Sequence, residues 1–384
     1  MSHRTVAALA RTLRGHVGLG KSRLETLCML VVGMVGGRTV NLTHIASAGA
    51  RGVQIASTCR RLQRFFQHVD LGPDWAVTII ARLIGQSGDW TLALDRTTWK
   101  IGARDVNHLV LAVVTRRFRV PLFWTLPGGT GDSATAARIA LMKRYLAHFP
   151  ASSVRILLAD REFIGAEWLK YLNDNTIRFA IRLREDLRVT CDDGFDLTLL
   201  ARLRRAGRTR FFQARIGTRK DAAVNDAPRL HFAAKRLKGE WLIVVSNTPG
   251  GKALAAYRKR WAIECLFGAA KTRGLNIEDT RLTNPRKLAL LMALAALAIV
   301  WAGRVAADLL GVASPKRKAH GHFAQSWFRV GFDRLRNPLA SDQAEAVSPW
   351  RRLQNRIENT LWSKESCRVP PAPSEDRPRG PGGV

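Results

Sequence analysis

Two aspartates in this chain each follow a short, strongly apolar run of the kind that forms a buried strand. Asp95 closes the run WTLALD, and Asp160 closes the run VRILLAD. A carboxylate at the end of a buried strand emerges at the rim of the sheet, where ligands bind in open α/β folds. A single aspartate there is often only a turn-former, so the pair is the informative observation. To hold two hard divalent cations, the pair would still need a third carboxylate.

The third carboxylate is predicted to come from a helix around Glu264. Four polar residues at offsets 0, 3, 7 and 14 form one stripe, roughly 60° wide at about 100° per residue: Tyr257, Arg260, Glu264 and Lys271. The opposite arc is apolar and suited to packing on a sheet; it holds Ala262, Ile263, Cys265, Leu266, Ala269 and Ala270. A surface helix with an ion pair between Arg260 and Glu264 is the alternative. That alternative leaves Tyr257 and Lys271 unexplained.

The stripe also carries a resemblance. The spacing Y-x2-R-x3-E-x6-K is similar, at all four positions, to the signature of DDE transposases of the insertion-sequence 4 family. The segments LALDRTTW and ILLADREF resemble the first and second aspartate motifs of that family, and a basic β-rich segment before the glutamate helix is another of its features. The resemblance extends from about Ser57 to about Arg304.

Membership of that family would imply metal-dependent phosphoryl transfer on DNA. Asp95, Asp160 and Glu264 would then be the catalytic residues and the ligands of two Mg²⁺ ions, with Mn²⁺ as a substitute. Asp95 would bridge both ions, and each of the other two would complete one. Such a pair of ions relieves charge at the attacking and the leaving oxygen. The resemblance further implies that Tyr257, Arg260 and Lys271 contact phosphates near the transposon end.

The resemblance also implies a reaction sequence and partners. Relatives cut one strand, let its 3′ hydroxyl attack the other strand to form a hairpin, reopen the hairpin and join the ends to target DNA. The expected partners are transposon-end duplex DNA, target DNA and a second copy of the chain in a synaptic homodimer. Hairpin formation needs a flipped base and a stacking platform. Trp241 is a candidate by position, although packing in the core beside residues 242–245 is the favoured alternative.

Composition agrees with a polyanionic partner. The 384 residues include 62 Lys and Arg against 30 Asp and Glu, a net charge of +32. A hydrophobic fraction of 46% excludes a disordered polycation, although a ribosomal or membrane-surface protein would share the charge. Five cysteines without a C-x-x-C pair argue against a zinc module and a disulfide framework. They suit a reducing cytoplasm, where a nucleoid-associated bacterial protein is expected.

No membrane span is expected. The longest apolar run, residues 288–303, has 16 residues. A span needs about 20. A buried core helix is therefore the preferred interpretation of this run.

The order of predicted elements favours an α/β fold with a ribonuclease H-like core. Three β-rich runs are followed by a helix, a strand, a helix and a strand between residues 90 and 184. The predicted parts are a helical DNA-binding domain, the first part of the core, a basic β insertion, the second part of the core with the catalytic helix, a C-terminal region for dimer or DNA contacts, and a disordered tail. Their ranges are 1–85, 86–181, 182–240, 241–312, 313–368 and 369–384.

Arg60, Arg61 and Arg64 are candidate DNA contacts in the N-terminal domain. Residues 41–68 predict two short helices separated by Gly52, and the second of them is basic. This pattern resembles a helix-turn-helix reader of a DNA groove. An ordinary helical hairpin with a solvated basic face is equally consistent with it, so both interpretations stay open.

The leading functional hypothesis is a Mg²⁺-dependent cut-and-paste transposase. A transposase-derived DNA-binding protein without catalysis is one alternative, although the complete set of Asp, Asp and Glu argues against it. A ribonuclease H-like nuclease that cuts without strand transfer is another.

Overall fold

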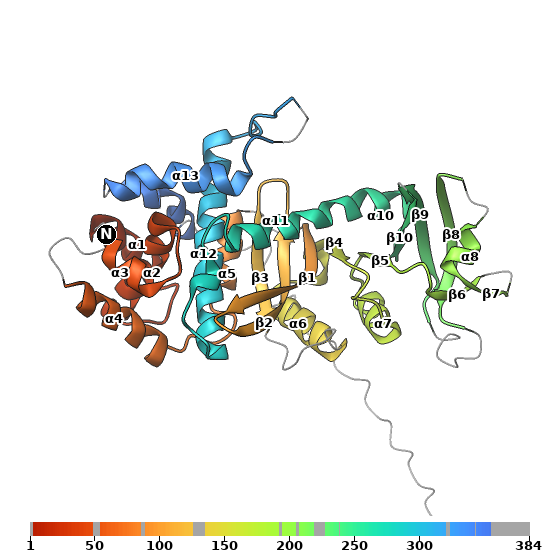
Figure 1. Cartoon of the computed structure of the whole chain (residues 1–384), viewed down its shortest axis with the longest axis horizontal. Helices are drawn as coiled ribbons and strands as arrows, with labels where there is room; N and C mark the ends of the chain where they lie inside the picture. The colour runs from red at the N-terminus through yellow and green to blue at the C-terminus, as the bar shows by residue number, and fades with distance from the viewer. Residues whose placement is uncertain are drawn as a thin grey trace, which may run out of the picture.

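The computed structural model shows an elongated molecule built around one long sheet (Figure 1). It describes residues 3–48, 54–85, 89–125, 135–191, 194–204, 207–218, 227–237, 239–319, 323–341 and 343–354. A group of helices occupies one end of the molecule, and the last strands of the sheet occupy the other. The class is mixed α/β, as the sequence predicts.

The first half of the sheet has the predicted order of elements. Among the described residues one ten-stranded sheet runs β3-β2-β1-β4-β5-β10-β9-β8-β6-β7. Its first three strands are antiparallel, while β4 and β5 run parallel to β1. The bounds are Trp90–Ile101 for β1, Arg104–Val114 for β2, Arg119–Thr125 for β3, Val154–Ala159 for β4 and Phe179–Leu183 for β5.

Strand β1 is longer than the sequence predicts. It continues six residues beyond Asp95 and forms a hairpin with β2, which pairs Asp95 with Val110 and Ile101 with Arg104. Gly102 supplies the positive φ, 60°, that a two-residue hairpin turn requires. The prediction that Asp95 ends a strand is therefore wrong. What ends near Asp95 is the pairing with β4, because its last partners are Leu94 and Ala159.

The basic segment before the glutamate helix extends the same sheet. Strand β10, Glu240–Ser246, pairs antiparallel with β5 and β9. Phe212 and Phe232 stack with ring centroids 5.0 Å apart, so apolar contacts hold β8 against β9. The other elements of the segment are β6 (Arg188–Cys191), β7 (Asp196–Thr198), α8 (Leu199–Leu203), β8 (Thr209–Ile216) and β9 (Leu230–Leu237).

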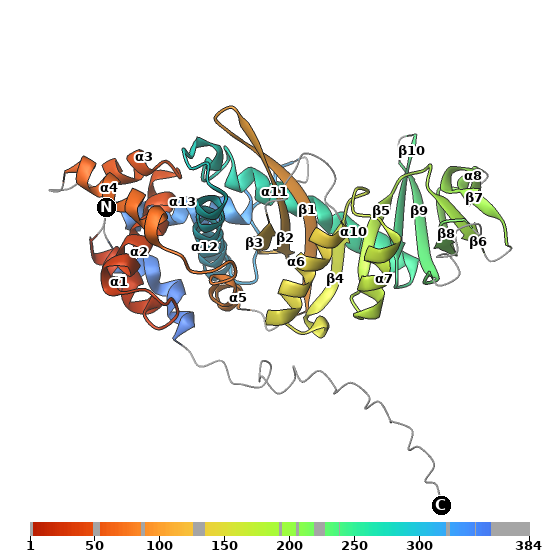
Figure 2. The same cartoon turned by 90° about the horizontal axis from the view of Figure 1, so that it is seen from below.

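Helices cover both faces of the sheet (Figures 1 and 2). Helices α6, Thr135–His148, and α7, Ala166–Asp174, lie on one face, and η1, Ala151–Ser153, leads from α6 into β4. A nearly continuous helical path crosses the other face: α10 (Gly250–Tyr257), the 3₁₀ turn η2 (Arg258–Arg260) and α11 (Trp261–Ala270). A further 3₁₀ turn, η3 (Ile277–Asp279), then lies against β1.

The long apolar helix α12, Pro285–Leu310, connects the sheet to the helical end. With 26 residues, and with a mean hydropathy of 2.2 over its most apolar 18-residue window, it is long and apolar enough to cross a membrane, so the length argument against a span is wrong. However, 83% of its most apolar window is buried against the rest of the protein. This burial identifies α12 as a core helix.

The remaining helices pack at the α12 end (Figure 1). The C-terminal pair, α13 and η4, folds back on α1, α2 and α12. Gly331 permits this crossing, because a Cβ atom there would stand 1.8 Å from the Ala302 carbonyl oxygen. The bounds are α1 (His3–Leu13), α2 (Lys21–Gly37), α3 (Leu42–Ala48), α4 (Ile55–His68), α5 (Val77–Ile84), α13 (Trp327–Ala340) and η4 (Ala344–Leu353). Gly52 and the predicted tail lie outside the described residues.

Candidate active site

The two aspartates lie side by side because of the strand register. Leu94 of β1 is paired with Ala159 of β4 in a parallel ladder. The next residues are Asp95, which stays in β1, and Asp160, which follows β4 directly. The ladder therefore delivers two carboxylates to adjacent positions at the carboxyl edge of the parallel strands.

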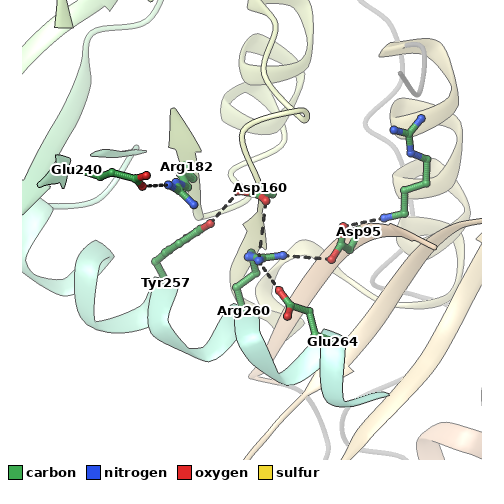
Figure 3. A network of polar contacts seen from close by, with 8 residues as sticks. Asp95, Asp160, Arg182, Glu240, Tyr257, Arg260 and Glu264 are labelled. Carbon is green, nitrogen blue, oxygen red and sulfur yellow. Dashed lines mark hydrogen bonds and ion pairs between the residues drawn. The ribbon is translucent and has the colours of Figure 1, made fainter. Parts of the chain in front are cut away.

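The helical path on the sheet brings Glu264 to the same place (Figure 3). The Arg260 guanidinium is the common centre: its Nη1 lies 3.1 Å from Asp95 Oδ2, and its Nη2 lies 2.7 Å from Glu264 Oε1. Nη2 also lies 3.9 Å from Asp160 Oδ2. Three carboxylates from three elements thus surround one cation.

Tyr257 joins the group from the preceding turn. Its hydroxyl donates a hydrogen bond of 3.1 Å to Asp160 Oδ1, and the residue is 7% exposed. Burial, followed by the charge of Asp160, raises the pKa of the Tyr257 phenol, so the neutral donor is the stable form. Tyr257 thereby fixes the orientation of the Asp160 carboxylate.

Burial sets the electrostatics of the Asp95 carboxylate. The side chains of Asp95 and Arg260 are each 13% exposed. Burial raises the pKa of Asp95 to about 6, opposed by the hydrogen bond from the Arg96 amide and by the charge of Arg260. Glu162 and Asp160 raise it further as like charges. A second cation would relieve this excess of negative charge.

The donor set fits hard divalent cations. Carboxylate oxygens are the ligands that Mg²⁺ and Mn²⁺ prefer, and these three carboxylates already converge on a positive group. Within the described residues no three His, Cys, Asp or Glu side chains are grouped closely enough to hold an ion as they stand. The reason is that the guanidinium of Arg260 occupies the space between the three carboxylates.

Lys271 does not lie in this group. Helix α11 ends at Ala270, and Lys271 is its C-cap, with φ −81° and ψ −142°. Its Nζ donates to the Thr98 carbonyl oxygen at 2.8 Å and pairs with Glu278 at 3.2 Å. Lys271 keeps a helical φ, and its amide donates to the Phe267 carbonyl, so it still follows the helical path. It lies beyond the carboxylates because seven residues separate it from Glu264, about 10 Å along a helix.

Trp241 lies in β10 and is 7% exposed. Its amide donates to Glu185 at 2.9 Å, and the Arg236 guanidinium lies 6.0 Å from its ring centroid. The indole is thus packed into the sheet, as in the core interpretation that its apolar neighbours favour. Stacking of a flipped base on Trp241 stays a prediction.

The three arginines of α4 differ in their surroundings. Arg60 and Arg64 are exposed on α4, whose buried side includes Leu62, Phe65 and Phe66. Arg61 is instead tied to α2, because its Nε donates to the Thr26 hydroxyl at 2.8 Å and its Nη2 lies 3.6 Å from Glu25. Arg60 and Arg64 therefore remain the accessible candidates for DNA.

Sequence reasoning missed one ion pair beside the carboxylates. Arg96 Nη2 lies 3.0 Å from Glu162 Oε2, and both side chains are largely buried. The pair links the residues that follow Asp95 and Asp160 in the chain. Its signal was the position of the two residues, since Arg96 directly follows Asp95 and Glu162 lies two residues beyond Asp160.

Fold and site together define an α/β protein with an acidic centre at the carboxyl edge of its parallel strands. The family model of the transposase DDE domain matches residues 86–301, more than half of the chain. The chain therefore belongs to the DDE transposase domain family, whose members are metal-dependent DNA-cleaving enzymes.

The chain also has a low similarity to a solved structure. A cryo-electron microscopy structure of the piggyBac transposase synaptic complex with hairpin DNA is similar over 97% of this chain and 84% of that chain, with 11% identity and a TM-score of 0.43. A likeness at this level carries no argument. Among curated proteins no significant match to this chain is found.

Proposed function

We propose that the protein is a transposase that cuts DNA at the inverted-repeat ends of its element and joins those ends to target DNA. The observation that carries the proposal is the convergence of Asp95, Asp160 and Glu264 on the single cation Arg260. Three acids that share one arginine leave an excess of negative charge, which bound divalent cations would compensate. Membership of the DDE family supports the same conclusion.

The sheet supports a ribonuclease H-like core. Three strands, a helix, a strand, a helix and a strand follow one another along the chain, as predicted for that core, and in the sheet these strands lie in the order β3-β2-β1-β4-β5. In this arrangement Asp95 belongs to the central strand β1, and Asp160 follows its parallel neighbour β4. Glu264 comes from α11, which crosses one face of the sheet, so each acid is supported by a different rigid element.

Asp95, Asp160 and Glu264 would hold two divalent cations, with Asp95 shared between them and Mg²⁺ as the expected metal. When bound, these ions supply charge relief at the attacking and leaving oxygens of the phosphodiester. The chain itself orients the ligands: Tyr257 fixes Asp160 by its hydrogen bond, and the Arg96 amide fixes one oxygen of Asp95 at 2.8 Å.

Arg260 is proposed to change partners when DNA binds. In the free protein its guanidinium lies within ion-pair distance of all three carboxylates and offsets part of their charge. A phosphate at the site offers the same planar, two-pronged partner that a carboxylate does. Arg260 would then contact the phosphate next to the cut, and the carboxylates would be free for metal.

DNA on either side of the cut would be held by the basic surfaces. Arg60 and Arg64 on α4 are proposed to contact the inverted repeat, and Lys271 is proposed to contact a phosphate near the end. The likeness of the Tyr257–Lys271 spacing to the insertion-sequence 4 signature supports a hairpin intermediate and a synaptic homodimer.

The test is cleavage of a duplex made from the inverted repeats expected on both sides of the coding sequence. Asp95→Asn, Asp160→Asn and Glu264→Gln each remove a charged ligand at nearly constant shape. Each should lower the rate of cleavage and hairpin formation by at least about 10²–10³-fold, while DNA affinity stays within about threefold, because the charge change is small beside the whole phosphate contact.

Glu240→Gln is the matched control, since Glu240 is a nearby acid whose side chain is 82% exposed. Its cleavage rate should equal that of the wild type. Substantial cleavage by any of the three site variants removes that residue from the site. Cleavage without joining to a plasmid target would favour a nuclease, and specific binding without any cleavage would favour a DNA-binding protein.

A further inference from the structure

A basic pocket lies on the other side of the helical turn that carries Arg260. Its volume is about 490 Å³, within the range of pockets that accept a ligand group. Five cationic side chains and one indole line it: Arg116, Arg119, Arg155, Arg258, Lys259 and Trp261. Asp89 is the one acidic residue among the described lining residues. The pocket therefore has a strong positive excess and an aromatic wall.

The pocket lies at the amino ends of β1, which carries Asp95, and β4, which directly precedes Asp160. Thr91 and Asp89 line it beside the start of β1, and Arg155 lies at the start of β4. Arg258 precedes Arg260 by two residues, which places it roughly 120–160° around the helix axis from Arg260. One helical turn thus presents Arg260 to the carboxylates and its neighbours to the pocket.

The side chains of the pocket are accessible to a large anion. Arg258 and Lys259 are exposed, and Trp261 is 66% exposed, which is costly for so large an apolar side chain. Asp89 holds Arg155 by an ion pair, and the hydrogen bond from Arg155 lowers the pKa of Asp89. Asp89 also adopts a positive φ of 58°, a strained conformation for a residue with a side chain.

We propose that this basic pocket is a second DNA-backbone site, distinct from the carboxylate site. Phosphates of bound DNA would pair with Arg258 and Lys259, and a sugar or base would pack against Trp261. The inference rests on the proposed function, since it places the pocket on the same DNA that reaches Asp95. The pocket would contact a segment of the DNA that the carboxylate site does not reach.

The geometry gives the spacing of the two sites on the DNA. Asp89 and Thr91 are four to six residues from Asp95 along the chain, about 13–20 Å at about 3.3 Å per residue. B-DNA rises about 3.4 Å per base pair. The pocket should therefore hold phosphates about four to six base pairs from the reacting one, on either the flanking or the element side of the cut.

The test compares Arg258→Ala/Lys259→Ala with a control pair, Lys143→Ala/Lys170→Ala. Lys143 and Lys170 are exposed on α6 and α7, which cover the opposite face of the sheet. Each double variant removes two positive charges, so the two differ only in where the charge is lost. Affinity for the end duplex is measured over about 50–200 mM salt. The slope of log affinity against log salt should become shallower by roughly 0.9 for each lost phosphate contact in the pocket double alone.

Two further arms sharpen the result. Trp261→Ala should weaken binding without changing the salt slope, because it removes no charge. Duplexes shortened by about six base pairs on the flanking or the element side should identify the segment in the pocket, since the double variant and wild type will bind equally to one of them.

The inference is overturned if the pocket double keeps the wild-type slope, or if its defect survives both shortened duplexes. These outcomes leave the proposed function intact when the wild type still binds and cuts the end. A wild type that neither binds nor cuts it would instead overturn the proposed function itself.

Discussion

The two sides of the turn at Arg260 use the same kinds of residue in opposite ways. On one side, three acids surround one arginine that is 13% exposed. On the other, five cations and one acid line an open pocket with a 66% exposed tryptophan. The carboxylate side has an excess of negative charge around a largely buried arginine, whereas the pocket side has an excess of positive charge and is exposed.

This difference separates holding DNA from reacting with it. Exposed cations attract a polyanion at little cost, because water and salt solvate them in the free protein. Buried carboxylates are costly, so they must be paired until their metal and substrate arrive. Arg260 serves both purposes, because it is a cation that pairs with the carboxylates and can also pair with a DNA phosphate.

The largest expected contrast is between Arg260→Ala and Arg258→Ala. Arg260→Ala should lower cleavage by about 10²–10³-fold through loss of a charged contact to the phosphate. In DNA-free protein it should nevertheless tighten Mn²⁺ binding, because a competing cation has left the three carboxylates. Isothermal titration with Mn²⁺ and a cleavage assay measure the two effects. Arg258→Ala should leave the Mn²⁺ affinity unchanged.

Thermal unfolding provides a second readout for the same pair of variants. Without metal, Arg260→Ala leaves three partly buried carboxylates without their counter-ion, so its melting temperature should fall below that of the wild type. Mn²⁺ should raise the melting temperature of Arg260→Ala by more than it raises that of the wild type. An Arg260→Ala protein that binds Mn²⁺ no better than the wild type would show that Arg260 does not occupy the metal site.

The buried part of the sheet should also make the stability of the protein depend on pH, through His108 on β2. His108 is fully buried against Trp99, with ring centroids 4.0 Å apart, and neither ring nitrogen has a hydrogen-bond partner in the described part of the chain. Burial lowers its pKa from 6.5 to about 4. Because the folded state binds this proton less readily than the unfolded state, the stability is complete above about pH 6.5 and falls towards pH 4.

The expected loss from this one group is about 2–3 kcal/mol. His108→Phe should remove that part of the pH dependence in urea unfolding at a series of pH values. His68→Phe, at an exposed position on α4, is the control for loss of a histidine and should keep the wild-type profile. A His108→Phe profile parallel to that of the wild type would mean that this histidine is protonated equally in both states.

Much of the fold could be predicted from sequence because local patterns specify it. The apolar runs before Asp95 and Asp160 are β1 and β4, and the helix between them is α6. Gly102 could not mark the end of β1 in advance, since the extension of that strand depends on pairing with β2. The prediction of a buried core helix at residues 288–303 is confirmed, but the length of the apolar run could not establish it, because the burial of α12 depends on contacts with α2, α5, α13 and η4.

The same distinction applies to the site. Spacing along the chain was enough to group Tyr257, Arg260 and Glu264, because their separations are short and the 3₁₀ turn at Arg258–Arg260 keeps the helical path nearly continuous. Lys271 lies seven residues beyond Glu264, about 10 Å along a helix, so it reaches Thr98 of β1 instead of the carboxylates. The pairing of Arg260 with Glu264 at i,i+4 could be predicted and is present. Its contacts with Asp95 and Asp160 could not be derived, because they depend on the register of β1 with β4.

The smallest expected effect belongs to Lys271, and it tests where the DNA-contacting side ends. Lys271 ties the end of α11 to β1 through the Thr98 carbonyl and Glu278. If Lys271 only joins these elements, Lys271→Ala should cost about 0.5–1 kcal/mol of stability and leave the salt slope of DNA binding unchanged.

If Lys271 also contacts a phosphate, the slope should become shallower by roughly 0.9, and hairpin yield should fall with it. Glu278→Gln separates the two roles, because it breaks the ion pair while keeping the lysine charge. We expect Lys271→Ala and Glu278→Gln to lower stability alike and only Lys271→Ala to change the slope. Equal slopes for both variants would confine the phosphate contacts of this helical path to residues before Lys271.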